Sequence, residues 1–153
     1  MCGIAGYVGD RESADVLVDA LSKLEYRGYD SAGIAVFDHG NIKVKKCKGR
    51  LANLVEKMDE EGKPQGHVGI GHTRWATHGE PSDINSHPHG NKRVTIVHNG
   101  IIENYKKLKD FLVGEGYSFA SETDTEVAAK LLDYYYDGDP MKTIAKVLSE
   151  IKG

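Results

Sequence analysis

The chain has 153 residues, of which 39% are hydrophobic and 28% charged, and its formal net charge is −3 at pH 7. This length and hydrophobic content fit one globular domain with a sizeable buried core. The mild charge argues against a surface dedicated to nucleic acid or to a membrane, and no apolar run reaches the roughly 20 residues of a membrane-spanning helix. The composition therefore points to small polar metabolites and protein partners as ligands.

The N-terminal sequence MCGIAGYVGD lacks the basic lead and the long apolar run of a secretion signal. We therefore expect a cytoplasmic protein, in which the cysteines Cys2 and Cys47 stay unpaired because that compartment is reducing. Cys47 stands among lysines, and we interpret it as a strand residue without chemistry. Those lysines are expected to lower the pKa of its thiol modestly.

The first predicted elements are a strand and a helix. Residues 3–8 are small and apolar, which indicates a buried strand. Apolar side chains then recur at helical spacing from Ala14 to Leu24, with Asp10 as the expected cap of this helix. The helix is expected to stop before Gly28, which suits a left-handed turn.

A hairpin, a second helix and a further strand follow. Residues 32–37 and 42–44 flank a turn sequence, Asp-His-Gly-Asn, and together predict a β-hairpin. Apolar residues over 51–58 mark a short amphipathic helix, which the glycines and proline of residues 62–66 interrupt. Residues 68–73 are the next expected strand.

Residues 75–91 have no useful periodicity and are rich in His, Gly, Pro and Ser. A loop of that length inside a compact domain is usually functional or disordered, and its tryptophan and histidines favour a functional loop. Residues 94–97 predict a strand after it.

The last third of the chain is mainly helical. Apolar spacing predicts helices around residues 108–112, 127–135 and 144–151, separated by glycine-containing breaks. Because strands come first and helices later, the pattern favours a layered α+β domain over a parallel α/β sheet.

Cys2 directly follows the initiator methionine. Removal of Met1 would leave a thiol and a free α-amine on one residue, with unperturbed pKa values of about 8.5 and about 7.7–8.0. Near neutral pH the amine can act as general base for its own thiol, directly or through water. Attack on a carboxamide would release ammonia and leave a thioester for water to hydrolyse. On this dipeptide alone, an ordinary buried cysteine stays an open alternative.

Three further features suit an amidase, and each has an ordinary structural alternative. The side-chain amide of Asn99 and the backbone N–H of Gly100 could donate to an oxyanion, or the pair could form an ordinary turn. Arg74 could hold the carboxylate of glutamine, or form a surface ion pair. Asp124 could pair with the ammonium of glutamine, or cap a helix.

The histidines raise the question of a metal site. No HExxH pattern is present and no cysteine lies near them, so we expect neither a metal nor another cofactor. The histidines considered are His72, His78, His87, His89 and His98.

In combination these motifs resemble the class II, N-terminal-nucleophile glutamine amidotransferases, and among them the glutaminase domains of the glutamine–fructose-6-phosphate aminotransferases. The resemblance runs along essentially the whole chain in family order. It is carried by MCGIAGYVG at residues 1–9, LEYRGYDSAG at 24–33, GHTRWATHG at 71–79, VHNGIIEN at 97–104 and SETDTE at 121–126.

The resemblance implies a role for each motif position. Cys2 would be the nucleophile and its own amine the base. Asn99 and Gly100 would form the oxyanion hole, and Arg27 with Gly28 would order the catalytic site. L-Glutamine would be held by Arg74 at its carboxylate, Asp124 at its ammonium, Thr77 and His78 in the same pocket, Trp75 as part of the closure and His87 in a mobile loop over the site.

The implied fold is the N-terminal-nucleophile hydrolase fold, a four-layer αββα sandwich with two antiparallel sheets. Residues 1–153 are expected to be a partial glutaminase domain, incomplete at its C-terminus, poorly stable and of little activity by itself, with the sugar-isomerase domains absent. In the full-length enzyme, expected to be a homo-oligomer, the ammonia would convert fructose 6-phosphate to glucosamine 6-phosphate. Two alternatives stay open: a relative with another acceptor, and a non-catalytic glutamine-binding or interaction module, for example one that keeps Met1.

Overall fold

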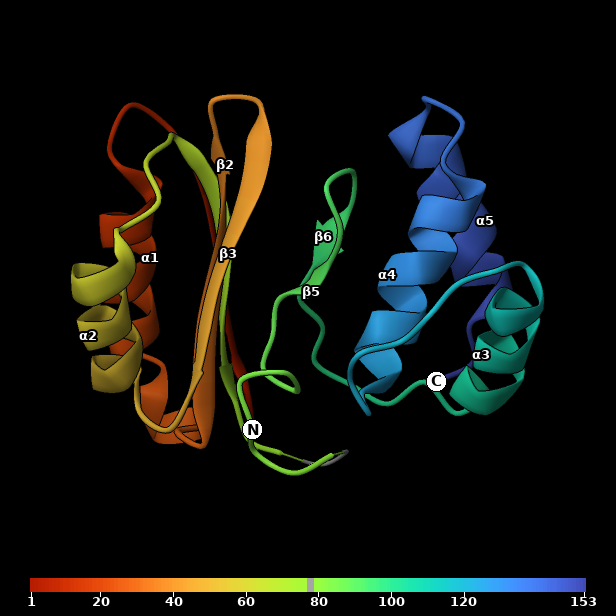
Figure 1. Cartoon of the computed structure of the whole chain (residues 1–153), viewed down its shortest axis with the longest axis horizontal. Helices are drawn as coiled ribbons and strands as arrows, with labels where there is room; N and C mark the ends of the chain where they lie inside the picture. Colours follow the sequence, from red (N-terminus) through yellow and green to blue (C-terminus); the bar gives the residue numbers. More distant parts are fainter. Residues whose placement is uncertain (77–78) are drawn as a thin grey trace.

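The computed structural model describes residues 1–76 and 79–153. Figure 1 shows its elements stacked as a helix layer, a sheet, a second small sheet and another helix layer. The predicted α+β class and αββα layer order are therefore confirmed. The outer helices on one side are α1 (Ser13–Ser22) and α2 (Leu51–Glu61), and those on the other side are α3 (Tyr105–Gly114), α4 (Asp124–Tyr135) and α5 (Pro140–Glu150).

The main sheet is antiparallel and has β4 near its centre. Across the sheet the strands are β1 (Gly3–Val8), β4 (Val68–Arg74), β2 (Ser31–Asp38) and β3 (Asn41–Lys48). The register pairs Gly3 with Thr73 and Ser31 with Arg74. The residue before β1 is therefore brought beside the end of β4.

The small sheet pairs β5 (His89–Gly90) with β6 (Thr95–Ile96). The strand expected over residues 94–97 is thus shorter than predicted. The long stretch expected to be a loop contains β5 within it. Its described part from residue 79 onward lies between the main sheet and the second helix layer (Figure 1).

Two separate apolar cores hold the outer layers in place. The first packs α1 and α2 on the main sheet, and the second joins α3, α4 and α5. Polar side chains are instead buried between these cores, where His72, His87, His89, Ser121 and Thr123 are each at most 6% exposed. The layer between the two apolar cores therefore contains buried polar side chains.

The hairpin predicted around residues 38–41 is confirmed. His39 and Gly40 both have positive φ, 47° and 86°, as a two-residue turn between right-twisted strands requires. Around the first helix the prediction was wrong in two details. Glu12, not Asp10, occupies the N-cap position of α1, and Gly28 is extended at φ −171°, after a short 3-10 turn at Glu25–Arg27.

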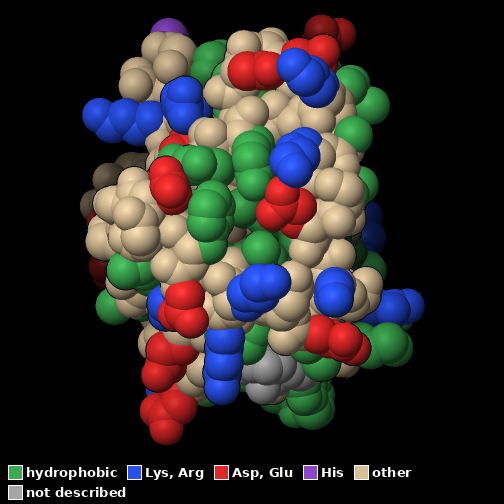
Figure 2. Space-filling model, turned by 90° about the vertical axis from the view of Figure 1, so that its right-hand side faces the viewer, with side chains coloured by type: hydrophobic (Ala, Val, Ile, Leu, Met, Phe, Trp, Pro, Cys, Tyr) green, Lys and Arg blue, Asp and Glu red, His purple; other side chains and the backbone are tan. Residues whose placement is uncertain are grey.

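The C-terminal helices begin at residues suited to capping. The Asp139 side chain accepts hydrogen bonds from the first backbone N–H groups of α5, and Pro140 starts that helix. α5 leaves Met141, Ile144 and Leu148 exposed. Figure 2 shows that on this side of the molecule hydrophobic side chains lie among interspersed charges of both signs. No helix in the described part of the chain is long and apolar enough to cross a membrane.

Candidate active site

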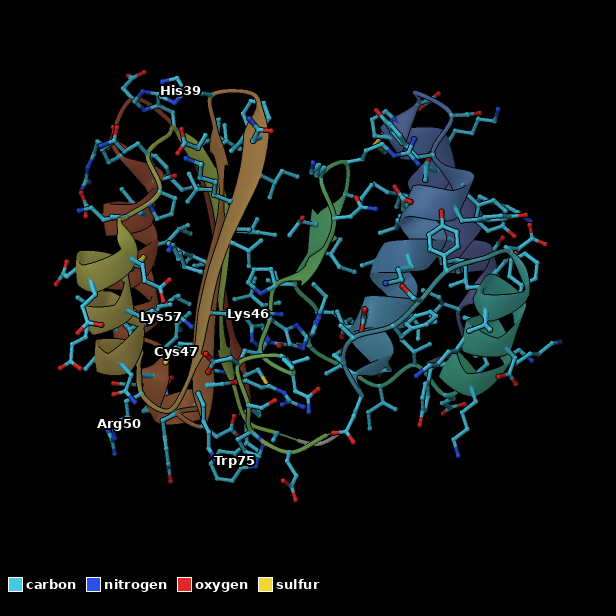
Figure 3. All side chains as sticks on the ribbon, viewed as in Figure 1. His39, Lys46, Cys47, Arg50, Lys57 and Trp75 are labelled. Atoms are coloured by element: carbon cyan, nitrogen blue, oxygen red, sulfur yellow. The ribbon has the colours of Figure 1, made fainter. Side chains whose placement is uncertain are left out.

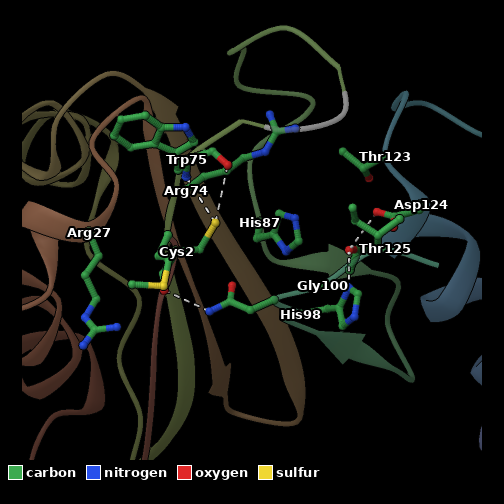
Figure 4. Close-up of a pocket in the computed structure, with 13 residues that line it drawn as sticks. Cys2, Arg27, Arg74, Trp75, His87, His98, Gly100, Thr123, Asp124 and Thr125 are labelled. Carbon is green, nitrogen blue, oxygen red and sulfur yellow. Dashed lines mark hydrogen bonds between the residues drawn. The ribbon is translucent and has the colours of Figure 1, made fainter. Parts of the chain in front are cut away.

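A pocket of about 430 Å³ opens where the start of β1, the end of β4 and the first residues of α4 meet (Figure 4). Most of the residues predicted from the sequence line it together, although they come from distant parts of the chain. Thr77 and His78 lie outside the described residues. The lining residues are Met1, Cys2, Arg27, Arg74, Trp75, His87, His98, Asn99, Gly100, Ile101, Thr123, Asp124 and Thr125.

The thiol of Cys2 faces the backbone of a single residue, Trp75. The backbone N–H of Trp75 donates to Cys2 Sγ at 3.2 Å, and the Trp75 carbonyl oxygen lies 3.5 Å from the same sulfur as an acceptor for the thiol (Figure 4). A thiolate is stabilised by a nearby N–H donor, and a thiol by a nearby acceptor. Both protonation states of Cys2 therefore have a partner at this position.

Residues of the LEYRGYDSAG motif hold the backbone on both sides of Trp75 in place. Asp30 donates its backbone N–H to the Arg74 carbonyl at 3.2 Å, and its carboxylate accepts a hydrogen bond from the Ala76 N–H. A Cβ on Gly28 would lie 2.7 Å from the Arg74 carbonyl carbon and 2.8 Å from the Trp75 nitrogen. Only glycine allows this approach, so Gly28 adjoins the pocket through the backbone rather than lining it.

Asn99 contacts the residue that carries the thiol. Its Nδ2 donates to the Cys2 carbonyl oxygen at 3.0 Å, and its Oδ1 lies 2.8 Å from Nε2 of His72. The chain continues from Gly100 towards α3 and not into a paired strand, so the hairpin-turn alternative for this pair is wrong. Gly100 has φ 153°.

Arg74 and Asp124 bring opposite charges to the pocket wall. Arg74 is 4% exposed and donates to the Gly79 carbonyl oxygen at 3.3 Å, so its side chain lies in the buried wall and not on the surface. Burial lowers the pKa of its guanidinium. Asp124 is 5% exposed and accepts from the Ile102 N–H at 2.8 Å, while the cap of α4 is Thr123. The helix-cap alternative for Asp124 is therefore wrong by one position.

Besides Met1, four lining residues were not predicted: His98, Ile101, Thr123 and Thr125. His98 Nδ1 lies 3.2 Å from Thr125 Oγ1, which joins the segment after β6 to the start of α4 (Figure 4). These residues adjoin Asn99 or Asp124 in the sequence. Their position next to motif residues was the only signal in the sequence. Their spacing did not show which neighbours of the motif residues would line the pocket and which would be buried elsewhere.

Behind the pocket, three histidine rings are packed together. His87 stacks on His72 with ring centroids 4.2 Å apart, and meets His89 edge-on at 4.8 Å. Burial lowers the pKa of His72 to about 4 and that of His89 to about 3, and it lowers the pKa of His87 as well. Within the described residues no three potential ligands converge as a metal site.

The segment that carries His87 is anchored from β3. Lys46 Nζ donates to the carbonyl oxygens of Ile84, Ser86 and Pro88 at 3.2, 2.9 and 3.3 Å. Figure 3 shows Lys46 and Cys47 on opposite faces of β3. Cys47 packs against the core under α2, and burial raises the pKa of its thiol, contrary to the lowering expected from its lysine neighbours.

Comparison with known proteins connects this pocket to a family. The sequence profile described as "Glutamine amidotransferase domain" matches residues 72–153. The whole chain is similar to proteins named glutamine–fructose-6-phosphate aminotransferase [isomerizing], with 59% identity to that of Clostridium tetani and 52% to that of Thermus thermophilus, each over 155 residues. It spans only 25% and 26% of the length of those relatives.

Two solved structures have a similar fold. One is glutamine phosphoribosylpyrophosphate amidotransferase from B. subtilis, with 28% identity and a TM-score of 0.83 over 100% of this chain and 33% of that one. The other is described as the allosteric regulatory enzyme of purine biosynthesis, with 28% identity and a TM-score of 0.85 over 100% of this chain and 34% of that one. The resemblance drawn from the motifs is confirmed by these matches.

Gly28→Ala should slow the reaction of the Cys2 thiol. The added Cβ displaces the Arg74–Trp75 peptide, so the Trp75 N–H no longer stabilises the thiolate. A hydrogen bond to a charged group contributes about 1.5–3 kcal/mol, so we expect alkylation, in which the thiolate is the nucleophile, to be at least about tenfold slower. The measurement is the rate of iodoacetamide alkylation as a function of pH, in a Cys47→Ser background so that one thiol reacts.

Gly6→Ala is the matched control for this substitution. Gly6 lies in β1, the strand that follows Cys2, and a Cβ added there meets nothing within 4 Å. This variant should react like the parent. Equal alkylation rates in Gly28→Ala and Gly6→Ala would show that the close approach at Gly28 does not set the thiol environment.

Stability should fall as the pH is lowered from about 6.5. His72 and His89 have folded-state pKa values of about 4 and about 3, below the usual 6.5, so the unfolded chain takes up their protons first. Each group should cost about 2 kcal/mol between pH 6.5 and pH 5. The measurement is the free energy of urea unfolding at about pH 7.5 and about pH 5.

His89→Gln should reduce the loss of unfolding free energy between about pH 7.5 and about pH 5 by about 2 kcal/mol, the contribution of one histidine, because glutamine does not titrate. His67→Gln is the control, since His67 is exposed and should leave the pH dependence unchanged. A parent and a His89→Gln variant with the same pH dependence would mean that the buried imidazoles are not the source.

Proposed function

Because the chain belongs to the family of glutamine amidotransferase domains, we propose that it hydrolyses L-glutamine to glutamate and ammonia through a thioester on Cys2. One observation carries this proposal: a single pocket joins the thiol of Cys2, the amide of Asn99 and the buried charges of Arg74 and Asp124. Such a set matches a substrate that has a carboxylate and an ammonium at one end and a carboxamide at the other.

Substrate binding follows from the two buried charges. The guanidinium of Arg74 receives the α-carboxylate, for which its planar donors suit a bidentate pair. The carboxylate of Asp124 receives the α-ammonium. Both side chains are at most 5% exposed, so they act in a water-poor wall where charge pairs are strong. The side chain of glutamine then extends towards Cys2, on the opposite side of the pocket (Figure 4).

The chemical step begins after Met1 is removed. The free amine of Cys2 takes the thiol proton, and the thiolate, next to the Trp75 N–H, attacks the carboxamide carbon. The developing oxyanion is stabilised by Asn99 Nδ2 and the Gly100 N–H. The ammonium of Cys2 returns its proton to the amide nitrogen as the carbon–nitrogen bond breaks, and ammonia leaves. Water then attacks the thioester, releasing glutamate and restoring the thiol.

The use of the ammonia is a wider part of the proposal. The relatives at 59% and 52% identity are named for transfer to fructose 6-phosphate, whereas the phosphoribosyl relative is only 28% identical. We therefore favour fructose 6-phosphate as the acceptor, with the sugar chemistry performed by sugar-isomerase domains outside residues 1–153. Residues 1–153 would be part of the glutaminase domain of a full-length enzyme that is cytoplasmic and homo-oligomeric. Both cysteines are free, which suits a reducing compartment.

Cys2→Ala should abolish glutamine hydrolysis. Among the described residues that line the pocket no other carries a thiol, and loss of a catalytic nucleophile costs on the order of a million-fold in rate. Cys2→Ser should keep the pocket and still be very slow, since a hydroxyl is a poorer nucleophile than a thiol near neutral pH. Release of glutamate and ammonia is the measurement, with mass spectrometry to show whether Met1 is absent.

Cys47→Ser is the control, because Cys47 lies away from the pocket on β3 and should leave hydrolysis at the parental rate. Hydrolysis by Cys2→Ala at the rate of the parent would overturn the assignment. Activity in a form that retains Met1 would overturn the role of the free amine.

Asp124→Asn should raise the KM for glutamine strongly. The amide keeps an oxygen that can accept from the Ile102 N–H, but it removes the charge that pairs with the substrate ammonium. Loss of one partner of a buried charge pair costs about 2–5 kcal/mol, or roughly 30-fold to several thousand-fold in affinity. Steady-state kinetics of glutamate release give the value.

Asp110→Asn makes the same chemical change on the exposed surface of α3 and should not alter the KM. If Asp124→Asn and Asp110→Asn had the same KM as the parent, Asp124 would serve only to hold the segment before α3.

A further inference from the structure

His72 does not line the pocket, yet it contacts the predicted oxyanion donor. Its Nε2 lies 2.8 Å from Asn99 Oδ1, and on the other side of that amide Nδ2 donates to the Cys2 carbonyl at 3.0 Å. We propose that His72 is a positioning residue, whose Nε2–H fixes the Asn99 amide with its NH2 group towards the nucleophile. The kinetic part of this inference rests on the proposed function.

The orientation of Asn99 needs such a restraint. A side-chain amide has two orientations related by a half turn, and they exchange the oxygen with the NH2 group. Only one of them presents donors to an oxyanion beside Cys2. Asn99 is exposed and lies in a segment without helix or strand, so its orientation is set by its two contacts: the Cys2 carbonyl at Nδ2 and His72 at Oδ1.

A neutral His72 selects the productive orientation. The ring is 1% exposed, and burial lowers its pKa to about 4, so it carries a single N–H near neutral pH. The Cys2 carbonyl can only accept, so Asn99 turns Nδ2 towards it and Oδ1 towards His72; the single ring proton of His72 therefore lies on Nε2. If the amide turned over, two donors would face each other and the hydrogen bond would be lost.

The imidazole is itself rigidly held. His72 is paired with Ile4 on one side and Gly33 on the other, near the end of the inner strand β4. Its ring is stacked on His87 at 4.2 Å with an interplanar angle of 13°. The backbone of His87 is in turn locked against Gly33, where a Cβ would lie 2.0 Å from the His87 carbonyl oxygen. His72 thus links the main sheet to the exposed amide of Asn99 through the hydrogen bond at Nε2.

The kinetic test is a double-mutant cycle in the protein as it is naturally made. His72→Leu should lower kcat by about tenfold or more, but by less than the roughly 10²–10³ lost with an oxyanion donor, and should leave the KM nearly unchanged. His72→Gln, whose amide nitrogen reaches a position similar to Nε2, should recover most of the rate. In an Asn99→Ala background His72→Leu should cause no further loss, because its effect passes through Asn99.

A purely structural His72 would lower kcat equally in both backgrounds, and His72→Gln would not rescue it; that result overturns the proposal. A second measurement needs neither activity nor a folded variant. Long-range ¹H–¹⁵N correlation spectra of the unmodified protein report the histidine tautomers, and His72 should be protonated at Nε2. A neutral Nδ1–H tautomer would also overturn the proposal. Absence of glutamine hydrolysis in the unmodified protein would instead reject the proposed function, and the spectra would still decide the tautomer.

Discussion

The antiparallel pairing of β1 with β4 is the constraint on which the site depends. Gly3 lies opposite Thr73, so the next residue outward, Cys2, comes beside the Trp75 peptide. A Cβ on Gly3 would lie 2.7 Å from Thr73 Oγ1 and from the Leu24 Cβ, which ties the start of the strand closely to its neighbours. A slip of one residue would turn every β1 side chain to the opposite face of the sheet. The register therefore fixes both the fold of the first layer and the place of the thiol.

The pocket forms where it does because the apolar cores lie elsewhere. One core is enclosed by α1, α2 and the main sheet, and the other by α3, α4 and α5. The space between them holds buried polar groups, many of which have partners within the protein, such as Lys46 with the carbonyl oxygens of the segment before β5. Such partners offset much of the free-energy cost of burying a polar group. This polar layer can therefore hold Arg74 and Asp124 out of water without collapsing around them.

Local sequence patterns predicted the elements better than they predicted the contacts. The apolar spacing of α1 and α2 reflects burial on one face, so it could be recognised directly. Turn and cap details depend on single positions, so the conformation of Gly28 and the capping role of Thr123 were predicted wrongly. Cys2 and Trp75 are 73 positions apart and Cys2 and Asn99 are 97 apart, so no local pattern joins them; the family resemblance did. The pKa of Cys47 was misjudged because adjacent lysines are visible in sequence whereas burial is not.

A nucleophile at a chain end poses a mechanical problem, since termini are usually poorly ordered unless they are tied down. Here the ties come from three directions: the β1 ladder beginning at Gly3, the Trp75 N–H at the sulfur and the Asn99 amide at the Cys2 carbonyl. Each tie uses backbone or a short amide and leaves the thiol itself open to the pocket. Asn99 therefore restrains the nucleophile before it donates to an oxyanion. Both roles depend on the orientation of its amide, which His72 contacts on the side away from Cys2. His72, a rigid and neutral donor within the main sheet, holds that amide in place, so a residue that does not line the pocket still shapes the site.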